Sequence, residues 1–98
     1  MSYEYKPEDF NLAILPKHMH GAMFRWITLG IRPGSFGMAC LENKLVQAFS
    51  HADEINTERM LDWATWLYGY APADCWGSPE KVNAWEAHRG LSGFKDEE

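Results

Sequence analysis

Apolar residues recur every three or four positions in four segments of this chain, and short runs rich in proline, glycine and polar residues separate these segments. Such a period predicts amphipathic helices. We predict the first helix from about Lys17 to Leu29, with Gly30 as its left-handed C-cap. Its apolar face consists of Ala22, Met23, Trp26 and Ile27.

The second helix is predicted to follow the turn at Pro33-Gly34, with Ser35 as its N-cap, and to end at about His51. Its apolar face consists of Met38, Leu41, Leu45, Ala48 and Phe49. After a polar stretch, either Asp53 or Asn56 is predicted to cap a third helix, which ends before residue 71. The apolar side of this helix consists of Met60, Leu61, Ala64, Leu67 and Tyr68, with Trp63 and Trp66 beside them.

The fourth helix has the clearest start in the chain. Ser78 is the predicted N-cap, Pro79 occupies the first helical position, and Glu80 adds negative charge to the first turn. Gly90 is predicted to close this helix.

These four segments predict an all-α fold, because no segment of useful length has the two-residue period of a strand. We expect a small bundle of about four helices over residues 17–91. Residues 1–16 contain two prolines and three aromatic residues, and we expect an extended N-terminal arm that lays aromatic side chains on the domain. Residues 92–98 are predicted to form a mobile acidic tail.

The composition favours a single cytoplasmic domain. A chain of 98 residues has room for one core. No segment resembles a signal peptide or approaches the roughly 20 apolar residues of a membrane span. The two cysteines, Cys40 and Cys75, are too few for a disulfide framework and are expected as free thiols. Five tryptophans are unusual for this length, and we expect at least one of them to serve a ligand or a subunit contact in a homo-oligomer, a dimer or a tetramer.

The charge is unevenly distributed along the chain. The net charge of −5 argues against DNA or RNA as a partner, since nucleic-acid affinity depends on neutralising phosphates. Residues 17–51, however, carry four basic side chains and one acidic one, while residues 52–98 carry four basic and ten acidic side chains. A basic segment in an acidic chain is suited to a small anionic ligand, or it is simply a solvated face.

The residues give little support to catalysis or metal binding. His18 and His20 are two positions apart, which places them on different sides of a helix, and neither Cys40 nor Cys75 has a second cysteine at CxxC spacing. Nucleophile-elbow, P-loop and dinucleotide-binding motifs are all missing. We therefore expect no catalytic residue, no metal and no cofactor.

Two glycine-led helix starts are the remaining candidates for a binding site, unless both are only well-capped helices. The start at 33–36 offers unpaired N–H groups to a phosphate, with nearby basic side chains, whereas Trp76 offers an aromatic face for a base. At the fourth helix, Pro79 removes a donor and Glu80 repels anions. The predicted ligand-binding residues are Arg25, Arg32, Gly34, Ser35, Phe36, Lys44, Trp76 and Tyr5.

Several blocks of the chain resemble a family of short phage and prophage proteins. They are Gly30–Phe36, Leu41–Leu45 with Ala48-Phe49 and Ala52-Asp53, Tyr70–Pro72, and Cys75–Val82 with Trp85. The resemblance covers about residues 20–90, and Cys-Trp-Gly-Ser-Pro is its most specific part. It extends to phage immune-evasion (anti-CBASS) sponges, which are oligomers that sequester cyclic nucleotide signals such as 3′,3′-cGAMP. His18-Met19-His20 departs from the more basic segment expected there.

The resemblance implies binding without hydrolysis, so the first functional hypothesis is sequestration of a cyclic dinucleotide. The alternative is an inhibitor that binds a host defence protein through the acidic residues of 52–98. A small-molecule hydrolase is the third hypothesis, and it would require turnover of the nucleotide.

Overall fold

The computed structural model of this chain describes residues 5–96, with side chains through residue 94. Within these residues all regular structure is helical and no strand occurs, which confirms the predicted all-α class. The prediction of about four helices is not confirmed, because the described residues form seven α-helices and four short 3₁₀ helices. The α-helices are α1 (His20–Leu29), α2 (Ser35–Leu41), α3 (Leu45–His51), α4 (Glu54–Glu58), α5 (Met60–Gly69), α6 (Pro79–His88) and α7 (Ser92–Asp96).

The N-terminal segment is not an extended arm over its described part. It forms 3₁₀ helices at Pro7–Phe10 and Leu12–Ile14, and a left-handed Asn11 (φ 55°) joins them. Burial explains the difference, because Leu12 and Leu15 both enter the core, and a turn brings residues three apart to the same side. Residues 1–4 of the predicted arm lie outside the described residues.

The first predicted helix begins as a 3₁₀ helix at Lys17–Met19 and continues as α1. It ends as the sequence predicts, with Gly30 in the left-handed conformation (φ 71°) and its N–H donated to the carbonyl of Trp26. Gly90 packs against this C-terminal end, where an added Cβ would lie 2.6 Å from the carbonyl oxygen of Ile27. A side chain at position 90 would therefore separate α1 from the end of α6.

The predicted second helix is wrong as a single element, because the chain leaves it at residues 42–44 and starts again as α3. Asn43 has a φ of 63°, and Lys44 donates its N–H to the carbonyl of Ala39, which is the hydrogen bond of a left-handed helix end. Asparagine tolerates the left-handed conformation better than most residues, so a sharp turn is possible at Asn43.

The N-cap of α2 is Gly34 and not the predicted Ser35. Ser35 is the first helical residue, and no side-chain hydrogen bond caps this helix start.

The predicted third helix is also divided, into α4 and α5, with Arg59 between them. Of the two caps that the sequence allows, the structure has Asp53, whose Oδ1 accepts the N–H of Asn56 at 2.7 Å. The start of α6 is confirmed, since Ser78 Oγ accepts the N–H of Lys81 and Pro79 is the first helical residue. This helix ends at His88, with a left-handed Arg89 before Gly90.

The predicted tail over 92–98 contains a short helix in its described part. Residues Ser92–Asp96 form α7, and the ring of Phe94 lies 6.4 Å from that of Trp85 and 4.2 Å from that of His88. Residues 97–98 lie outside the described residues, and the mobility of the tail stays a prediction.

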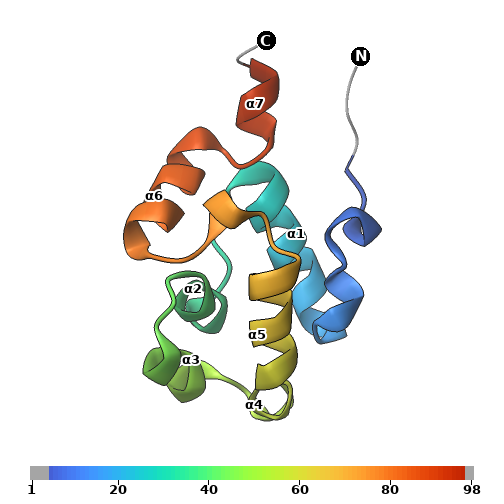
Figure 1. Ribbon diagram of the computed structural model, residues 1–98, viewed down its shortest axis with the longest axis vertical. Helices are drawn as coiled ribbons and strands as arrows, with labels where there is room; N and C mark the ends of the chain where they lie inside the picture. Colours follow the sequence, from blue (N-terminus) through green and yellow to red (C-terminus); the bar gives the residue numbers. More distant parts are fainter. Residues whose placement is uncertain (1–4, 97–98) are drawn as a thin grey trace.

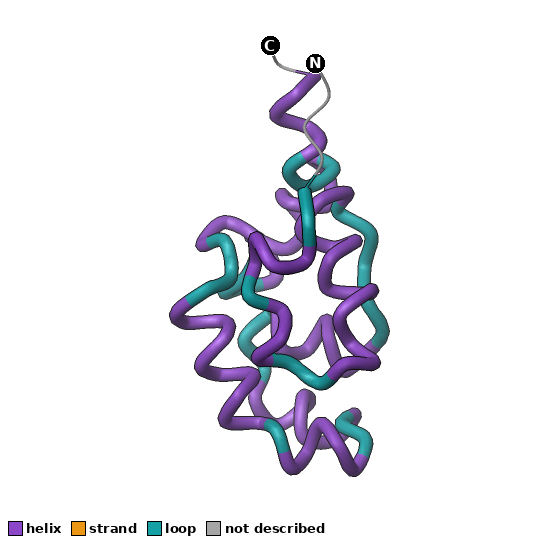
Figure 2. Tube along the Cα trace, turned by 90° about the vertical axis from the view of Figure 1, so that its right-hand side faces the viewer, coloured by secondary structure: helices purple, strands orange, loops and turns teal. Residues whose placement is uncertain are grey.

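The helices surround one core that is rich in tryptophan. Figure 1 shows α3 and α4 at one end of the long axis and α7 at the other, with α5 beside the N-terminal segment. Figure 2, turned by 90°, again has α7 at the end, and only helices and loops appear in it. The largest fully buried side chains are Trp26, Trp63, Trp66, Leu12, Leu15, Met23, Ile27 and Leu41.

Candidate functional site

A groove of about 440 Å³ lies between α2, α3 and α5, and Trp76, in the loop before α6, also lines it. Its volume is in the range of ligand and peptide sites. The lining consists of Ala39, Cys40, Asn43, Lys44, Leu45, Ala48, Phe49, Met60, Leu61, Trp63, Ala64, Leu67, Tyr68 and Trp76.

The walls of the groove expose large apolar side chains to solvent. On α3, Leu45 is 67% exposed and Phe49 is half-exposed, while on α5 Leu61 is 79% and Tyr68 90% exposed. Leu45 and Phe49 are four positions apart, and Leu61 and Tyr68 are seven apart, so each pair lies on one side of its helix. Single exposed apolar residues are ordinary, but a row on both walls of a groove is typical of an interaction site.

A network of polar side chains fixes the floor of the groove at Trp63. The indole N–H of Trp63 donates to Oδ1 of Asn56 at 3.0 Å, and Asn56 is only 2% exposed. The backbone of Asn56 is held in turn by the cap residue Asp53. Across the ring, Phe36 packs edge-on against Trp63 with centroids 5.1 Å apart. The ring of Trp63 is therefore held in one orientation from two sides.

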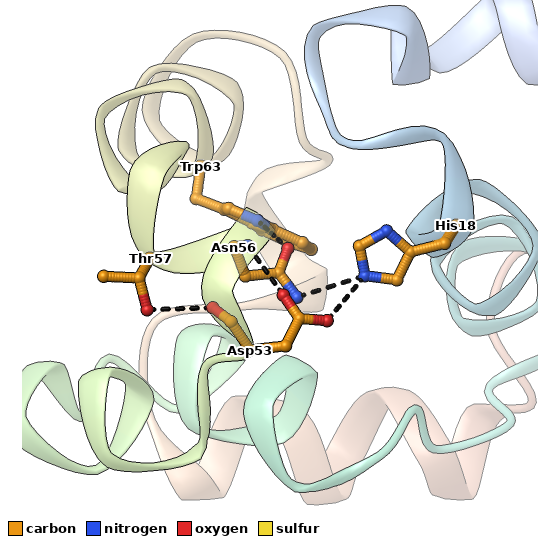
Figure 3. Close-up of polar contacts among 5 residues, drawn as sticks. All are labelled: His18, Asp53, Asn56, Thr57 and Trp63. Atoms are coloured by element: carbon orange, nitrogen blue, oxygen red, sulfur yellow. Dashed lines mark hydrogen bonds and ion pairs between the residues drawn. The ribbon is translucent and has the colours of Figure 1, made fainter.

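The same network reaches the segment before α1. Figure 3 shows His18 pointing toward the α4 region, where its Nε2 lies 2.9 Å from Oδ2 of Asp53 and 3.4 Å from Nδ2 of Asn56. Thr57 donates its hydroxyl to the backbone carbonyl of Asp53. The N–H of Asn56 and then His18 lower the pKa of Asp53, because both favour the carboxylate form. This contact ties the chain before α1 to the cap of α4.

Trp76 differs from the other four tryptophans. Their indole N–H groups all donate to protein acceptors: Trp26 to the carbonyl of Cys75, Trp63 to Asn56, Trp66 to the carbonyl of Phe10, and Trp85 to the carbonyl of Trp26. Their side chains are between 0 and 5% exposed. Trp76 is half-buried beside the groove, and its indole N–H has no acceptor among the described residues.

Backbone contacts position Trp76 at the end of α2. Trp76 is extended, and the following Gly77 has a φ of 125°, a conformation that side chains rarely adopt. Gly77 donates its N–H to the carbonyl of Leu41 at 2.7 Å, and Ser78 then caps α6. The glycine and the serine of the Cys-Trp-Gly-Ser-Pro block therefore hold the backbone next to Trp76 at the end of α2, and Trp76 lines the same groove as Asn43 and Lys44.

Lys44 is the one charged residue among the described residues that line the groove. Its Nζ lies 3.3 Å from Oε1 of Glu42, at a partly exposed position where such a pair contributes little stability. Cys40 lies deeper in the lining, and burial raises the pKa of its thiol to about 12. The groove thus carries one cation at its edge and an unreactive thiol at its base.

Most of the predicted phosphate-binding residues lie away from this groove. Arg32 donates from Nε and Nη2 to the carboxylate of Glu86, at 2.7 and 2.9 Å, and from Nη2 to Asn83. This bidentate pair raises the pKa of Arg32 and lowers that of Glu86. Arg25 is exposed on α1 and is not part of the lining.

The residues predicted for a phosphate site at the start of α2 have different surroundings. Gly34 is an exposed N-cap, and Ser35 is exposed on the first turn of a helix of only seven residues. Phe36 is buried against Trp63, and Tyr5 packs against Phe10 with ring centroids 5.9 Å apart. Of the eight predicted ligand-binding residues, the groove brings together only Lys44 and Trp76.

The described residues contain no group of three or more histidine, cysteine or acidic side chains that could hold a metal ion. None of their helices is long and apolar enough to cross a membrane. Cys40 and Cys75 are both free and buried.

Comparison with protein-family models, with curated proteins and with solved structures finds no match to this chain.

Proposed function

We propose that this chain is a non-catalytic binding protein and that its groove takes the apolar face of an amphipathic helix from a partner protein. The observation that carries the proposal is the row of exposed apolar side chains on both walls, Leu45 and Phe49 on α3 and Leu61 and Tyr68 on α5. The sequence also suggests binding to a protein through the acidic residues of 52–98. The present proposal keeps a protein partner but makes the apolar groove the contact surface.

The shape and length of the walls support a helical occupant. Helix-in-groove recognition places an apolar stripe, spaced at three, four and seven positions, between two helices. The wall formed by α5 has ten residues, which corresponds to about 15 Å, or about three turns of a docked helix. Lys44 lies at the edge and is paired with Glu42 at 3.3 Å, so the apolar stripe, and not charge, should dominate recognition of the partner helix.

Selection of stapled helical peptides tests this function. A library with random residues at the four stripe positions is displayed on a surface and selected against the wild-type protein, and the affinity of selected peptides is measured by fluorescence polarisation. We expect Ala64→Glu, which places a charge in the groove, to weaken binding more than tenfold.

Thr65→Glu is the matched control, because Thr65 is the exposed neighbour of Ala64 on α5 and does not line the groove. Its affinity should remain within about twofold of the wild type. A library that yields no binder, or binders that tolerate Ala64→Glu as well as Thr65→Glu, would refute the proposed function.

Sequestration of a cyclic dinucleotide is a second candidate, and one observation favours it. Trp76 and Lys44 line the same groove, so a base could stack on the indole while a phosphate contacts the ammonium group. The separation of Arg25 and Arg32 from the groove weighs against it, since two phosphates would then share one cation.

Calorimetric titration with 3′,3′-cGAMP tests the second candidate. Dissociation constants below micromolar, a loss of binding in Trp76→Ala and recovery of intact nucleotide after heating would support it. Turnover of the nucleotide would instead support the hydrolase hypothesis. Competition between the nucleotide and a selected peptide would place both in the groove.

A further inference from the structure

Side-chain hydrogen bonds tie the segment before α1 to α4 and α5 at three points, spaced four positions apart along that segment. In chain order they join Phe10 to Trp66, Ile14 to Arg59, and His18 to Asp53. At the first two points a backbone carbonyl accepts an indole or guanidinium N–H, and neither donor changes its protonation in mild acid. The third point joins two groups that both titrate, so it is the one of the three that can respond to pH.

Two neighbours make opposite demands on Nε2 of His18. The indole N–H of Trp63 can only donate, so the atom of Asn56 that faces it is the amide oxygen, and the amide NH₂ of Asn56 faces His18 at 3.4 Å. That NH₂ group needs an Nε2 without a proton, whereas the carboxylate of Asp53 at 2.9 Å needs an Nε2 that carries one. The shorter contact to the charged acceptor is the stronger one, so the proton belongs on Nε2.

The other ring nitrogen of His18 is left to solvent. Figure 3 shows Nδ1 turned away from Asp53 and Asn56, and it has no hydrogen-bond partner among the described residues. The side chain is 43% exposed, so water reaches it. The neutral ring therefore keeps its proton on Nε2 and takes up a second one at Nδ1. Titration of the ring adds a charge and leaves the hydrogen bond to Asp53 in place.

The charged groups around the imidazole ring, apart from Asp53, are mostly basic. Lys17 and Arg59 line a small cavity together with this histidine, and Asp62 is paired with Nε of Arg59. On the same segment, His20 bonds through Nε2 to a backbone carbonyl, a contact that a protonated ring keeps as a donor. Without the charge of Asp53, the protonated ring would have no carboxylate partner of its own.

We propose that the contact between His18 and Asp53 stays closed on both sides of neutral pH and opens in acid, when Asp53 loses its charge. In acid the imidazolium faces a neutral carboxyl group and the NH₂ group of Asn56, which is a donor as well, so His18 leaves the cap of α4. The pKa of Asp53 is lowered, first by the backbone N–H of Asn56 and then by His18. The opening therefore requires a pH below the ordinary aspartate value of about 3.9.

The opening is local. The contacts of Phe10 and Ile14 do not titrate in this range, and Leu12 and Leu15 are buried in the core. The segment therefore keeps its place on α5, and its end beside α1 is the part that comes free. The charge of Asp53 controls how the start of α1 is held.

The proton position is tested by two-bond ¹H–¹⁵N correlation spectra, which distinguish the two neutral tautomers of a histidine, at about pH 8, where an ordinary imidazole is neutral. We expect His18 in the Nε2–H form in the wild type. In Asp53→Asn the new amide keeps its oxygen at the cap and turns its NH₂ toward the ring, so both neighbours are donors and His18 should change to the Nδ1–H form. Glu58→Gln, at the other end of α4, is the control and should keep the wild-type tautomer.

The acid opening is measured by NOEs between the ring protons of His18 and the β-protons of Asp53. The ¹³C shift of the Asp53 carboxyl carbon reports its protonation in the same samples. We expect the NOEs to survive the titration of the ring and to be lost with the midpoint of the carboxyl group. The indole N–H of Trp66, which is bonded to the carbonyl of Phe10, should keep its NOEs to the segment over this range.

Three results would overturn the proposal. An Nδ1–H tautomer in the wild type, or the same tautomer in Asp53→Asn as in the wild type, would contradict the proton position. NOEs that disappear with the titration of the ring would make His18 the controlling group in place of Asp53. A simultaneous loss of the contacts of His18 and Trp66 would mean that the whole fold opens and that no local opening exists. The groove takes no part in these measurements, so the proposed function stands or falls separately.

Discussion

Gly77 donates its backbone N–H to the carbonyl of Leu41 at 2.7 Å, and this hydrogen bond brings the loop before α6 against the end of α2. It joins two segments that lie 36 positions apart in the sequence. Because of this contact, Trp76 and Lys44 line the same groove. Trp76 packs against the core only in part, and it is held at a surface where an indole face and an indole N–H can both be used.

The buried contact between Asn56 and Trp63 predicts a loss of stability on mutation. In Asn56→Ala the indole N–H of Trp63 loses its acceptor while it remains buried, so we expect the free energy of unfolding to fall by about 1–3 kcal/mol. Urea denaturation measures the change. Asn83→Ala, at an exposed position on α6, should stay within about 0.5 kcal/mol of the wild type, and an equal effect of both variants would contradict the account.

Two glycine positions should respond to alanine in opposite directions. Gly90 has a φ of 59°, and a Cβ there would meet the carbonyl oxygen of Ile27 at 2.6 Å, so Gly90→Ala should destabilise the fold by about 2–4 kcal/mol. Gly69 ends α5 with nothing within 4 Å of an added Cβ. Gly69→Ala should stabilise by about 0.5 kcal/mol in thermal unfolding, and a loss of stability there would count against this description of α5.

Asp53 predicts part of the pH dependence of stability. Its pKa in the folded state is lowered, mainly by the N–H of Asn56 and then by His18. Its contribution is therefore complete above the unfolded pKa of about 3.9 and is lost as the pH falls through the folded value. Asp53→Asn keeps an N-cap and removes the charge.

We therefore expect the wild type to be more stable than Asp53→Asn in urea at pH 6 and the difference to shrink as the pH falls through the lowered pKa of the folded state. Glu58→Gln, at the other end of α4, is the control and should leave the acid limb of the stability curve unchanged. A difference between wild type and Asp53→Asn that grows on acidification would contradict the role given to this carboxylate.

The groove thiol provides a probe of occupancy. Burial raises the pKa of both Cys40 and Cys75 to about 12, so few thiolates are present at pH 8 and both should react slowly with a disulfide reagent until the protein unfolds. In Cys75→Ser the remaining reaction reports Cys40, which lines the groove. A selected peptide at saturation should slow it further, and an unchanged rate would place the peptide elsewhere.

Local signals in the sequence predicted the helix ends that depend only on neighbouring residues. Ser78 with Pro79 and the left-handed Gly30 need only contacts within a few positions, and both are found as predicted. The break at Asn43 was not predicted, because an asparagine takes the left-handed conformation only where the surrounding chain favours a turn.

Only two of the predicted ligand-binding residues, Lys44 and Trp76, line the groove, and long-range pairing explains the place of Arg32. Arg32 is taken up by Glu86, which is 54 positions away, and no local pattern reveals such a partner. The surplus of tryptophan pointed to one ring with a role outside the core, and Trp76 matches that signal. The sequence pattern places Leu61 and Tyr68 on the apolar side of the third predicted helix, whereas α5 turns Trp63, Trp66 and Leu67 to the core and leaves Leu61 and Tyr68 exposed.

The central claim is that the groove between α3 and α5 receives a partner helix. Intermolecular NOEs between an isotope-labelled protein and an unlabelled selected peptide test it most directly. We expect contacts from the peptide stripe to the methyl groups of Leu45 and Leu61 and to the indole of Trp76. Contacts confined to exposed apolar residues outside the groove, such as Leu29 and Ile31 near the end of α1, would contradict the claim.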